Sequence, residues 1–456
     1  MFSLYRPFLL GEDETDEFAH LWGGRRWFRG RWWYTLAHVC QRWKNIILGS
    51  ASYLELSLVC TYGTHVADML AHSPPFPLVV DYFNKDRDIT SDEEGIVLAL
   101  KQRDRVCRLR LQMTTTCVQK FIAIMDEEYP ILKFLAVELP IEDNSGILTF
   151  PETLQAPLLR HLRLIGFALP IGSLLPTTAV GLVTLCLVMV HPSTYLHPNT
   201  LLQWISLLPQ LETLVIHFIH STPSRDLERQ LTHTPIIAPV TLPNFHYFRF
   251  HGASNYLDAL VHWIAAPRLE KLQFELFNQL TFSVPSLQQF INTAENLRFD
   301  SAAFTFSGER VDTVVFLKAE TKTFTIGIVV ICWHLDWQVS SVAQVSNSLS
   351  QMFSAVDSLV LRHRVHSQSS EEHDEVDRTE WRKLLRPFRN VKTLWIDKGL
   401  DKDISRCLQS EDGELPLELL PELQELRCYR EGDIGDAFAS FIDARQNAGR
   451  PVIVAR

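Results

Sequence analysis

One apolar spacing recurs along most of this chain: an apolar residue, two variable positions, a second apolar residue, one variable position and a third apolar residue. Seven clear copies begin at Leu182, Leu211, Phe245, Leu269, Val356, Val391 and Leu423. The last three positions of each copy alternate, which is the side-chain period of a short strand with one apolar face. One such strand cannot bury its apolar face alone, whereas a stack of them can. The pattern therefore predicts a structure built by stacking.

The form and spacing of the copies indicate which class of repeat protein the chain belongs to. The L-x-x-L-x-L form is the strand segment of a leucine-rich repeat, whose period is about 20–29 residues. The central positions Leu109, Leu135, Leu162 and Leu185 are 26, 27 and 23 residues apart. Weaker copies are predicted at residues 294–299 and 321–326, the second with Phe324 in the central position, and the later spacings are longer. The repeats are therefore expected to be irregular.

Amphipathic stretches and proline turns separate the predicted strands. Residues 200–208 show a helical apolar period, and Pro209, Pro243, Pro267 and Pro421 each stand just before a strand copy. Proline ends the helix before the strand begins. The predicted fold class is α/β: a leucine-rich-repeat solenoid, in which a curved ladder of parallel strands carries outer helices. Alternating helices and strands also fit a doubly wound sheet, but the strand pattern and the lack of a glycine-rich phosphate loop favour the solenoid.

Composition excludes several classes of partner. The 456-residue chain carries a formal net charge of −10, which argues against nucleic acid as its main partner. No apolar run is long enough to span a bilayer and no signal peptide is visible, so no membrane partner is predicted. The 8 cysteines are scattered without a C-x-x-C pair. The predicted location is therefore a reducing compartment, the cytoplasm or the nucleus.

Catalytic and metal-binding patterns are not found in the sequence. There is no G-x-S-x-G, H-E-x-x-H, P-loop or dinucleotide-binding fingerprint. His363, His366 and His373 stand among acidic residues, but their spacing matches no closed metal site and predicts a polar loop. We therefore expect a protein that is not an enzyme and that needs no cofactor and no metal.

A basic aromatic cluster of four arginines and four tryptophans occupies residues 22–33. Such a mixture can stack on nucleic-acid bases or rest at a membrane surface. No basic domain surrounds it, so the preferred interpretation is an insertion whose tryptophans pack on a neighbouring helix while the arginines remain in water.

A different pattern precedes the repeats. Leu36, Val39, Cys40 and Trp43 have a helical spacing and share one predicted face, and Ile47 follows one turn later. The leucine, the V-C-x-x-W motif and the aliphatic pair after it resemble the latter half of an F-box. Residues 48–56, 60–63 and 65–78 look like the junction between F-box and repeats in F-box proteins of mushroom-forming fungi.

This resemblance implies a function and a domain organisation. The chain would be a substrate-recognition subunit of a cullin–RING (SCF-type) ubiquitin ligase, with an incomplete F-box-like segment at 1–50, an insertion at 11–32 and a solenoid at 51–456. Its implied partners are an SKP-type adaptor and a protein substrate bound by the repeats, whose identity the sequence does not give. The residues implied to contact the adaptor are Leu36, Val39, Cys40, Trp43 and Ile47.

The sequence departs from the F-box pattern at its start. An F-box opens with a helix bearing an L-P motif, and residues 1–10 do not carry that motif. We therefore expect weak adaptor binding and partial exposure of Val39 and Trp43, because an apolar side chain contributes in proportion to the area it buries. Two alternatives stay open: a repeat scaffold without a ligase link, and an enzyme on a doubly wound sheet.

Overall fold

The computed structural model describes most of the chain in sixteen segments. These are residues 32–50, 54, 56–83, 91–139, 148–189, 196–218, 239–276, 284–294, 299–307, 310–318, 323–331, 334–364, 376–397, 399–409, 419–428 and 434–455. The chain divides into two compact units, one formed by residues 1–140 with 153–158, the other by residues 141–152 with 159–456. Each unit is described by itself below.

The first unit contains a four-stranded parallel ladder. Its strands pair in sequence order: β1 (Leu58–Cys60), β2 (Leu78–Tyr82), β3 (Val106–Gln112) and β4 (Phe134–Glu138). The helices between them are α4 (Val66–His72), α5 (Glu93–Leu100) and α6 (Thr115–Ile122). The residues that meet at the centre of the ladder are fully buried, namely Cys60, Val80, Leu109 and Leu135. A helix between successive parallel strands is the predicted repeating unit.

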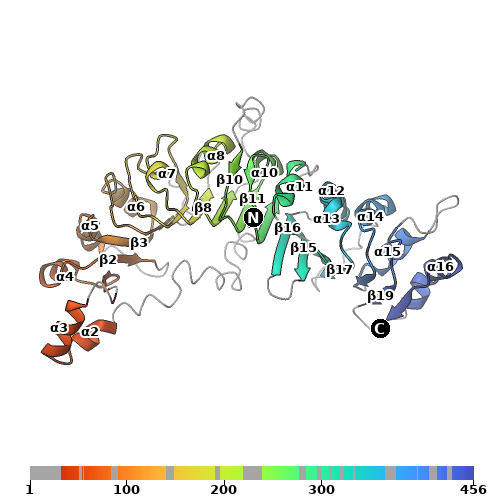
Figure 1. Ribbon diagram of the computed structural model, residues 1–456, viewed down its shortest axis with the longest axis horizontal. Coiled ribbons are helices and arrows are strands. Elements are labelled where there is room, and N and C mark those ends of the chain that lie inside the picture. Colours follow the sequence, from red (N-terminus) through yellow and green to blue (C-terminus); the bar gives the residue numbers. More distant parts are fainter. Residues whose placement is uncertain are drawn as a thin grey trace. The chain divides into compact units, whose positions relative to one another are not determined.

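The second unit begins with a five-stranded parallel ladder, also in sequence order. Its strands are β6 (His161–Ile165), β8 (Thr184–Met189), β9 (Thr213–Phe218), β11 (Tyr247–Gly252) and β13 (Lys271–Leu276). Its helices, α7 (Leu175–Thr178), α8 (Pro198–Ser206), α10 (Ser254–Val261) and α11 (Ser286–Asn292), lie along one side of these strands (Figure 1). Two short parallel pairs accompany the ladder, β5 (Leu148–Thr149) with β7 (Phe167–Ala168), and β10 (Val240–Thr241) with β12 (Ile264–Ala265). The predicted copies therefore form strands in the expected register.

The central residues of this ladder are stacked. Leu162, Leu185, Leu214, Phe248 and Leu272 follow one another in register, and none is more than 4 % exposed. The strand order runs without the reversal that marks a doubly wound sheet. The fold is therefore a leucine-rich-repeat ladder, and the doubly wound alternative is wrong.

The same hydrogen bonds fix each step of the ladder. The carbonyl oxygen of Val183 accepts the N–H groups of Glu212 and Thr213, at 2.8 and 3.0 Å. The carbonyl of Glu212 accepts those of His246 and Tyr247 in turn, at 3.0 and 3.1 Å. One carbonyl thus holds two donors from the next repeat, which satisfies the buried backbone where the strand begins.

The four predicted proline turns are confirmed. Around Pro209, the N–H of Leu211 donates to the carbonyl of Leu208 at 3.0 Å, which closes a turn with proline in its second position. The same hydrogen bond joins Phe245 to Leu242, Leu269 to Ala266, and Leu423 to Leu420. Each turn directs the chain from the helix side back into a strand.

Aromatic packing fills the core beneath β11 and β13. Phe248 is fully buried, and its ring centre lies 5.9 Å from Phe245, 5.6 Å from Phe274 and 6.2 Å from Phe290. The tilted and edge-on angles are those that aromatic pairs prefer. Because Phe290 belongs to α11, these contacts join the helix to the strands.

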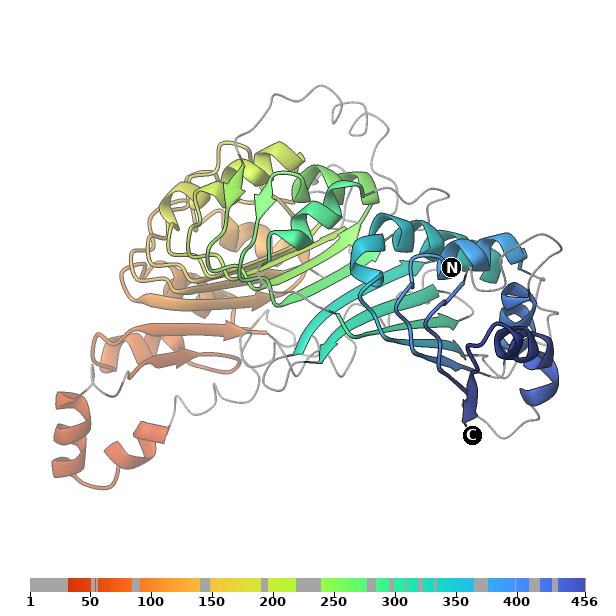
Figure 2. The same ribbon diagram turned by 45° about the vertical axis from the view of Figure 1, so that its right-hand side comes forward.

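A three-stranded antiparallel insertion interrupts the repeats. The strands β14 (Ser301–Ser307), β15 (Arg310–Lys318) and β16 (Thr323–Ile331) lie in the order β13-β16-β15-β14-β17, and β15 is antiparallel to both neighbours (Figure 2). Of the two weak copies predicted at 294–299 and 321–326, residues 295–298 and 321–322 lie outside the described residues. Ala302 is in register with the central Leu359 of β17, and Ile326 with the central Leu272 of β13, so the expectation of Phe324 in the central position of the second copy is wrong. Because β15 is antiparallel to both β14 and β16, the three strands form two consecutive hairpins.

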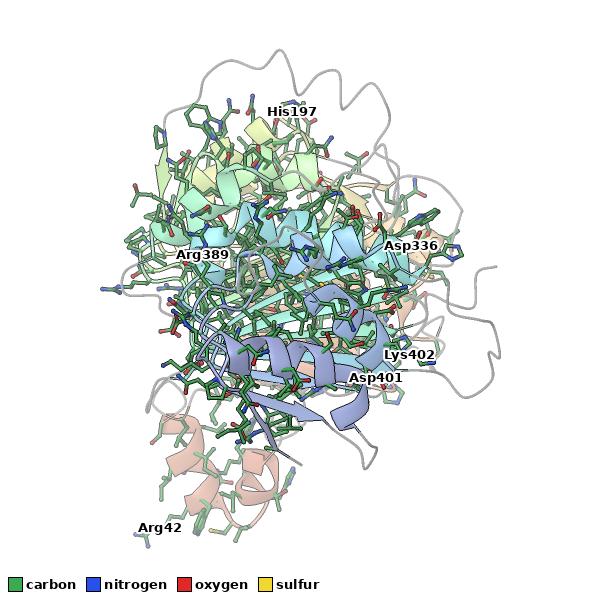
Figure 3. All side chains as sticks on the ribbon, turned by 90° about the vertical axis from the view of Figure 1, so that its right-hand side faces the viewer. Arg42, His197, Asp336, Arg389, Asp401 and Lys402 are labelled. Atoms are coloured by element: carbon green, nitrogen blue, oxygen red, sulfur yellow. The ribbon has the colours of Figure 1, made fainter. Side chains whose placement is uncertain are left out.

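Parallel repeats resume after the insertion. The strands β17 (Ser358–Arg364), β18 (Thr393–Ile396), β19 (Glu425–Cys428) and β20 (Ile453–Ala455) pair in sequence order. Their helices are α12 (Leu335–Ser348), α13 (Ser350–Phe353), α14 (Arg378–Leu385), α15 (Asp401–Leu408) and α16 (Ile434–Asn447). Figure 3 labels Asp401 and Lys402 where α15 begins. Leu359, Leu394 and Leu426 are fully buried, as their place in the pattern predicts.

Candidate protein-interaction face

The strands β6, β8, β9, β11 and β13 direct alternate side chains away from the buried leucines. These fifteen side chains form three rows across the ladder and are called the strand face. The first row is His161, Thr184, Thr213, Tyr247 and Lys271. The middle row is Arg163, Cys186, Val215, Arg249 and Gln273. The third row is Ile165, Val188, His217, His251 and Glu275. Alternation places them there, because neighbouring residues of a strand point to opposite sides.

Small side chains occupy the middle of the strand face. Thr184, Cys186 and Val188 on β8 are 1 %, 2 % and 7 % exposed, and Thr213 on β9 is 5 % exposed. Arg163 lies on the strand before them, and its Nη1 is 3.9 Å from the sulfur of Cys186. The strand face therefore has a floor of short side chains, with longer polar side chains on β6 and β11.

Hydrogen bonds hold several side chains of the first row. The ring of His161 is hydrogen-bonded through Nδ1 to the hydroxyl of Thr184 at 3.1 Å. The Tyr247 hydroxyl donates to the amide oxygen of Gln273 at 2.6 Å, and the Lys271 ammonium lies 5.5 Å from the centre of the Tyr247 ring. These contacts fix the direction of polar groups that a partner would meet.

Two histidines from neighbouring strands are joined in the third row. Nδ1 of His251 is hydrogen-bonded to Nε2 of His217, and the ring centres are 4.0 Å apart. Nδ1 of His251 also lies 4.0 Å from a carboxylate oxygen of Glu275. A hydrogen bond between two imidazoles needs a donor nitrogen on one ring and a lone pair on the other, so at least one ring is neutral.

Burial and a nearby arginine keep this histidine pair uncharged. Burial lowers the pKa of His251 to about 3, and the charge of Arg249 acts in the same direction. The pKa of His217 is lowered well below its usual value by burial, by His251, and then by Arg249 and Arg163. Both rings are therefore neutral at pH 7. The positive charges of Arg163 and Arg249 thus disfavour protonation of His217 on the strand face.

The first unit has a charged strand face of its own. The Arg108 guanidinium lies 3.8 Å from the centre of the Phe134 ring, and Arg110 lies 4.3 Å from that of Phe83. An Arg110 nitrogen is 3.5 Å from a carboxylate oxygen of Asp81. Burial lowers the pKa of Arg108 to about 9, with Arg110 as the next cause, and burial raises the pKa of Asp81. The negative charge of Asp81 therefore offsets part of the positive charge of the two arginines.

The residues predicted to contact the adaptor lie on two short helices and in the link between them. The chain forms α2 (Trp32–Ala37) and α3 (Gln41–Gly49), with Cys40 in an extended conformation (φ −164°, ψ 167°) between them. The expectation that Leu36, Val39, Cys40 and Trp43 share one face of a single helix is therefore wrong. The apolar period crosses a break at His38–Cys40, and a period of 3.6 residues has no meaning across a non-helical residue.

Burial differs strongly among these residues. Val39 is 61 % exposed and Trp43 is 47 % exposed, in agreement with the expected partial exposure. Cys40 is exposed and Leu36 is half-buried, whereas Ile47 is 3 % exposed. Only Ile47 of the five therefore packs fully against the protein.

Trp33 anchors the helical pair to the first repeat. Its side chain is 4 % exposed, its indole N–H donates to the carbonyl of Ser57 at 3.3 Å, and its ring meets Phe76 edge-on at 5.6 Å. Trp33 of the basic aromatic cluster is therefore packed, as expected, but against the first repeat and not on a neighbouring helix. Residues 22–31 of the cluster lie outside the described part of the chain.

Two further absences concern only the residues that the structure describes. Among them, no group of three or more histidine, cysteine or acidic side chains could hold a metal ion. His363 belongs to β17, but His366 and His373 lie outside the described residues. No described helix is long and apolar enough to cross a membrane.

Comparisons with known proteins give a likeness to solved structures. No protein-family model matches the chain, and no curated protein matches it significantly. Among solved structures, the leucine-rich repeat-containing protein LegL7 from Legionella pneumophila is similar at 10 % sequence identity and a TM-score of 0.24. The match covers 85 % of this chain and 97 % of that protein. A likeness this distant supports no argument about function. The fold assignment therefore depends on the strand pairing and burial described above.

Proposed function

We propose that the protein is a non-catalytic recognition subunit that binds a partner protein on the strand face of the second unit. The observation that supports this is the strand face itself: three rows of polar and small side chains, fixed by a ladder whose other side is fully buried. A face that is rigid before binding loses little conformational entropy when it binds. Stacked repeats offer such a surface to a partner as large as a protein.

Val215→Trp tests this role. Val215 is half-buried in the middle row, so an indole there projects from the strand face without entering the core. The control is Leu207→Trp, because Leu207 lies at the end of α8 and is 42 % exposed. Proteins recovered with each variant from cells are quantified by mass spectrometry. We expect specific proteins to fall at least tenfold with Val215→Trp and to remain with Leu207→Trp. Identical sets for both variants would contradict the proposed role.

We further propose that the bound protein is the substrate of a cullin–RING ubiquitin ligase. The specific support is an exposed apolar patch on the α2–α3 pair. Val39, Trp43 and Ile46 are 61 %, 47 % and 55 % exposed. Neighbouring exposed apolar side chains commonly mark a protein-binding surface. This patch would bind the SKP-type adaptor, and its presence favours the ligase role over a scaffold without an adaptor.

Calorimetry with purified adaptor tests the ligase role. We expect weak binding, with a Kd above about 1 μM, and a loss of roughly tenfold with Trp43→Ala, because an exposed indole buried on binding contributes its apolar area. The matched control is Trp337→Ala on α12, where the tryptophan is 44 % exposed. Equal effects of the two variants, or no binding by the unaltered chain, would leave only the scaffold role. A submicromolar Kd would show that the expectation of weak binding is wrong.

A further inference from the structure

We infer that the second unit binds a second copy of itself through an exposed apolar patch around α7, on the helix side of its ladder (Figure 1). The patch consists of Ile171, Leu174 and Val180, which are 79 %, 40 % and 52 % exposed, and is called the α7 patch. Neighbouring exposed apolar side chains mark an interaction surface, whereas single ones do not. The inference goes beyond the proposed recognition role and does not depend on it, because the strand face points away from the helix side.

One short helix holds these side chains close together. Leu174 is the N-cap of α7, and Val180 follows its C-cap, Ala179. A helical residue rises about 1.5 Å, so Leu174 and Val180 lie roughly 10 Å apart. The hydroxyls of Thr177 and Thr178 donate to the carbonyl of Leu174, at 2.8 and 3.0 Å. The polar groups between the apolar side chains are therefore already hydrogen-bonded, and covering them costs little.

Charged residues are missing from this stretch of the sequence. Residues 164–211 contain no aspartate, glutamate, lysine or arginine, although 21 % of the chain is charged. Depletion of charge is characteristic of the core of a protein interface. The net charge of −10 makes two copies of this chain repel each other. A second copy can approach most easily where the surface carries no charge.

Two opposite charges flank the α7 patch, one at each end. The carbonyl of Glu152 accepts the N–H of Leu174 at 2.8 Å, and a Cβ on Gly172 would lie 3.8 Å from Oε2 of Glu152. At the other end, the Arg160 guanidinium donates to the carbonyl of Gly181 at 3.4 Å. Both charged side chains belong to exposed residues. The α7 patch therefore has an acidic end and a basic end.

This arrangement is complementary to itself. A two-fold axis through the α7 patch exchanges its ends, so Glu152 of each copy faces Arg160 of the other. Two attractive charge pairs then surround an apolar centre, and such complementarity fixes the orientation of an interface. Standard interfaces use about 20–30 residues a side, more than the patch and its rim provide, so we expect a weak dimer with a Kd on the order of 10 μM.

Sedimentation velocity of the full chain, from about 1 μM to about 200 μM, covers this Kd. We expect monomer at the low end and dimer at the high end; monomer throughout would overturn the inference. Ile171→Glu should weaken association at least about tenfold, because its charge would have to be desolvated in the contact. The matched control is Ile453→Glu on β20, where the isoleucine is 70 % exposed, and it should change the Kd less than twofold. Equal effects of the two variants would place the contact elsewhere and contradict the inference.

Charge reversal tests the two-fold arrangement itself. Glu152→Arg alone and Arg160→Glu alone each place like charges opposite one another in both pairs, so each variant should remain monomeric. An equimolar mixture of the two restores both attractive pairs and should form a heterodimer, and the chain with both changes should dimerise again. Failure of both the mixture and the double variant to associate would overturn the inference.

Two further measurements exclude misfolding and a lipid surface as explanations. Thermal unfolding is compared for every variant at low concentration, where all are monomers and should unfold alike. Sedimentation with vesicles of neutral phosphatidylcholine is measured in parallel. A chain that stays monomeric in solution but pellets with the vesicles, and loses this with Ile171→Glu, would assign the α7 patch to lipid and overturn the inference.

Discussion

Leu214→Ala is the sharpest test of how the ladder is stabilised. Leu214 is fully buried on β9, with Leu185 and Phe248 in register on either side. Removing its side chain beyond Cβ loses the transfer free energy of the missing carbons and leaves a cavity, and such changes cost about 2–5 kcal/mol.

The position in the ladder sets where in that range the cost should fall. Hydrogen-bonded strands hold β9 from both sides, so the backbone cannot move inward to close the cavity. We therefore expect a cost in the upper half of the range, about 3.5–5 kcal/mol. Leu207→Ala in the same repeat is the control: Leu207 is 42 % exposed, so its cost should stay within about 0.5 kcal/mol.

Urea unfolding measures the loss of stability, and hydrogen exchange shows where along the chain it occurs. In a repeat array the loss can open neighbouring repeats before the rest, so exchange should increase first in β8, β9 and β11. A cost for Leu214→Ala below about 0.5 kcal/mol would refute the assignment of this residue to the core. Uniformly faster exchange along the whole chain would refute the local nature of the effect.

Three other changes test further features of the fold. Gly252→Ala should destabilise the protein, because a Cβ there would lie 2.6 Å from a ring carbon of Phe218, whereas Gly49→Ala meets nothing within 4 Å and should be tolerated in thermal unfolding. Arg445→Met should increase hydrogen exchange of α16, because the buried guanidinium donates to three backbone carbonyls at 2.9 to 3.2 Å; unchanged exchange would contradict this. His251→Gln should make the free energy of unfolding less sensitive to acid. Burial lowers the pKa of His251 in the folded protein to about 3, whereas the pKa of an unfolded histidine is about 6.5. Neutral His251 therefore contributes stability above pH 6.5, and this contribution is lost as the pH falls toward the folded pKa. Equal slopes between pH 7 and 4 for variant and unaltered chain would argue against a buried neutral ring.

The adaptor segment shows how far a local pattern can mislead. Leu36 to Trp43 has a helical period, yet Cys40 is extended and two helices form. Apolar spacing reports which residues prefer burial, not whether the backbone between them is continuous. The exposure of Val39 and Trp43 was expected for a different reason: residues 1–10 lack the L-P motif of the helix that would pack against them. That expectation is confirmed.

The sequence also contains information on the strand face that the apolar pattern does not show. His217 and His251 are 34 residues apart and become neighbours because both follow the central position of their repeat by three residues. Aligning the repeats on their leucines would have placed them in one row. The variable positions carry no period of their own, so their chemistry becomes visible only after the register is known.

The sequence by itself determined the repeating unit: short strands, proline turns, helices between them, and the central residues that are buried. Those features follow from local periodicity, which tertiary structure preserves. Only the tertiary structure decided the order β13-β16-β15-β14-β17 and the charge of the strand face. The physical reason is that parallel and antiparallel neighbours both bury alternate side chains, so the apolar pattern of Ser301–Ile331 fits either arrangement. The hydrogen bonds between strands far apart in the chain select one of them.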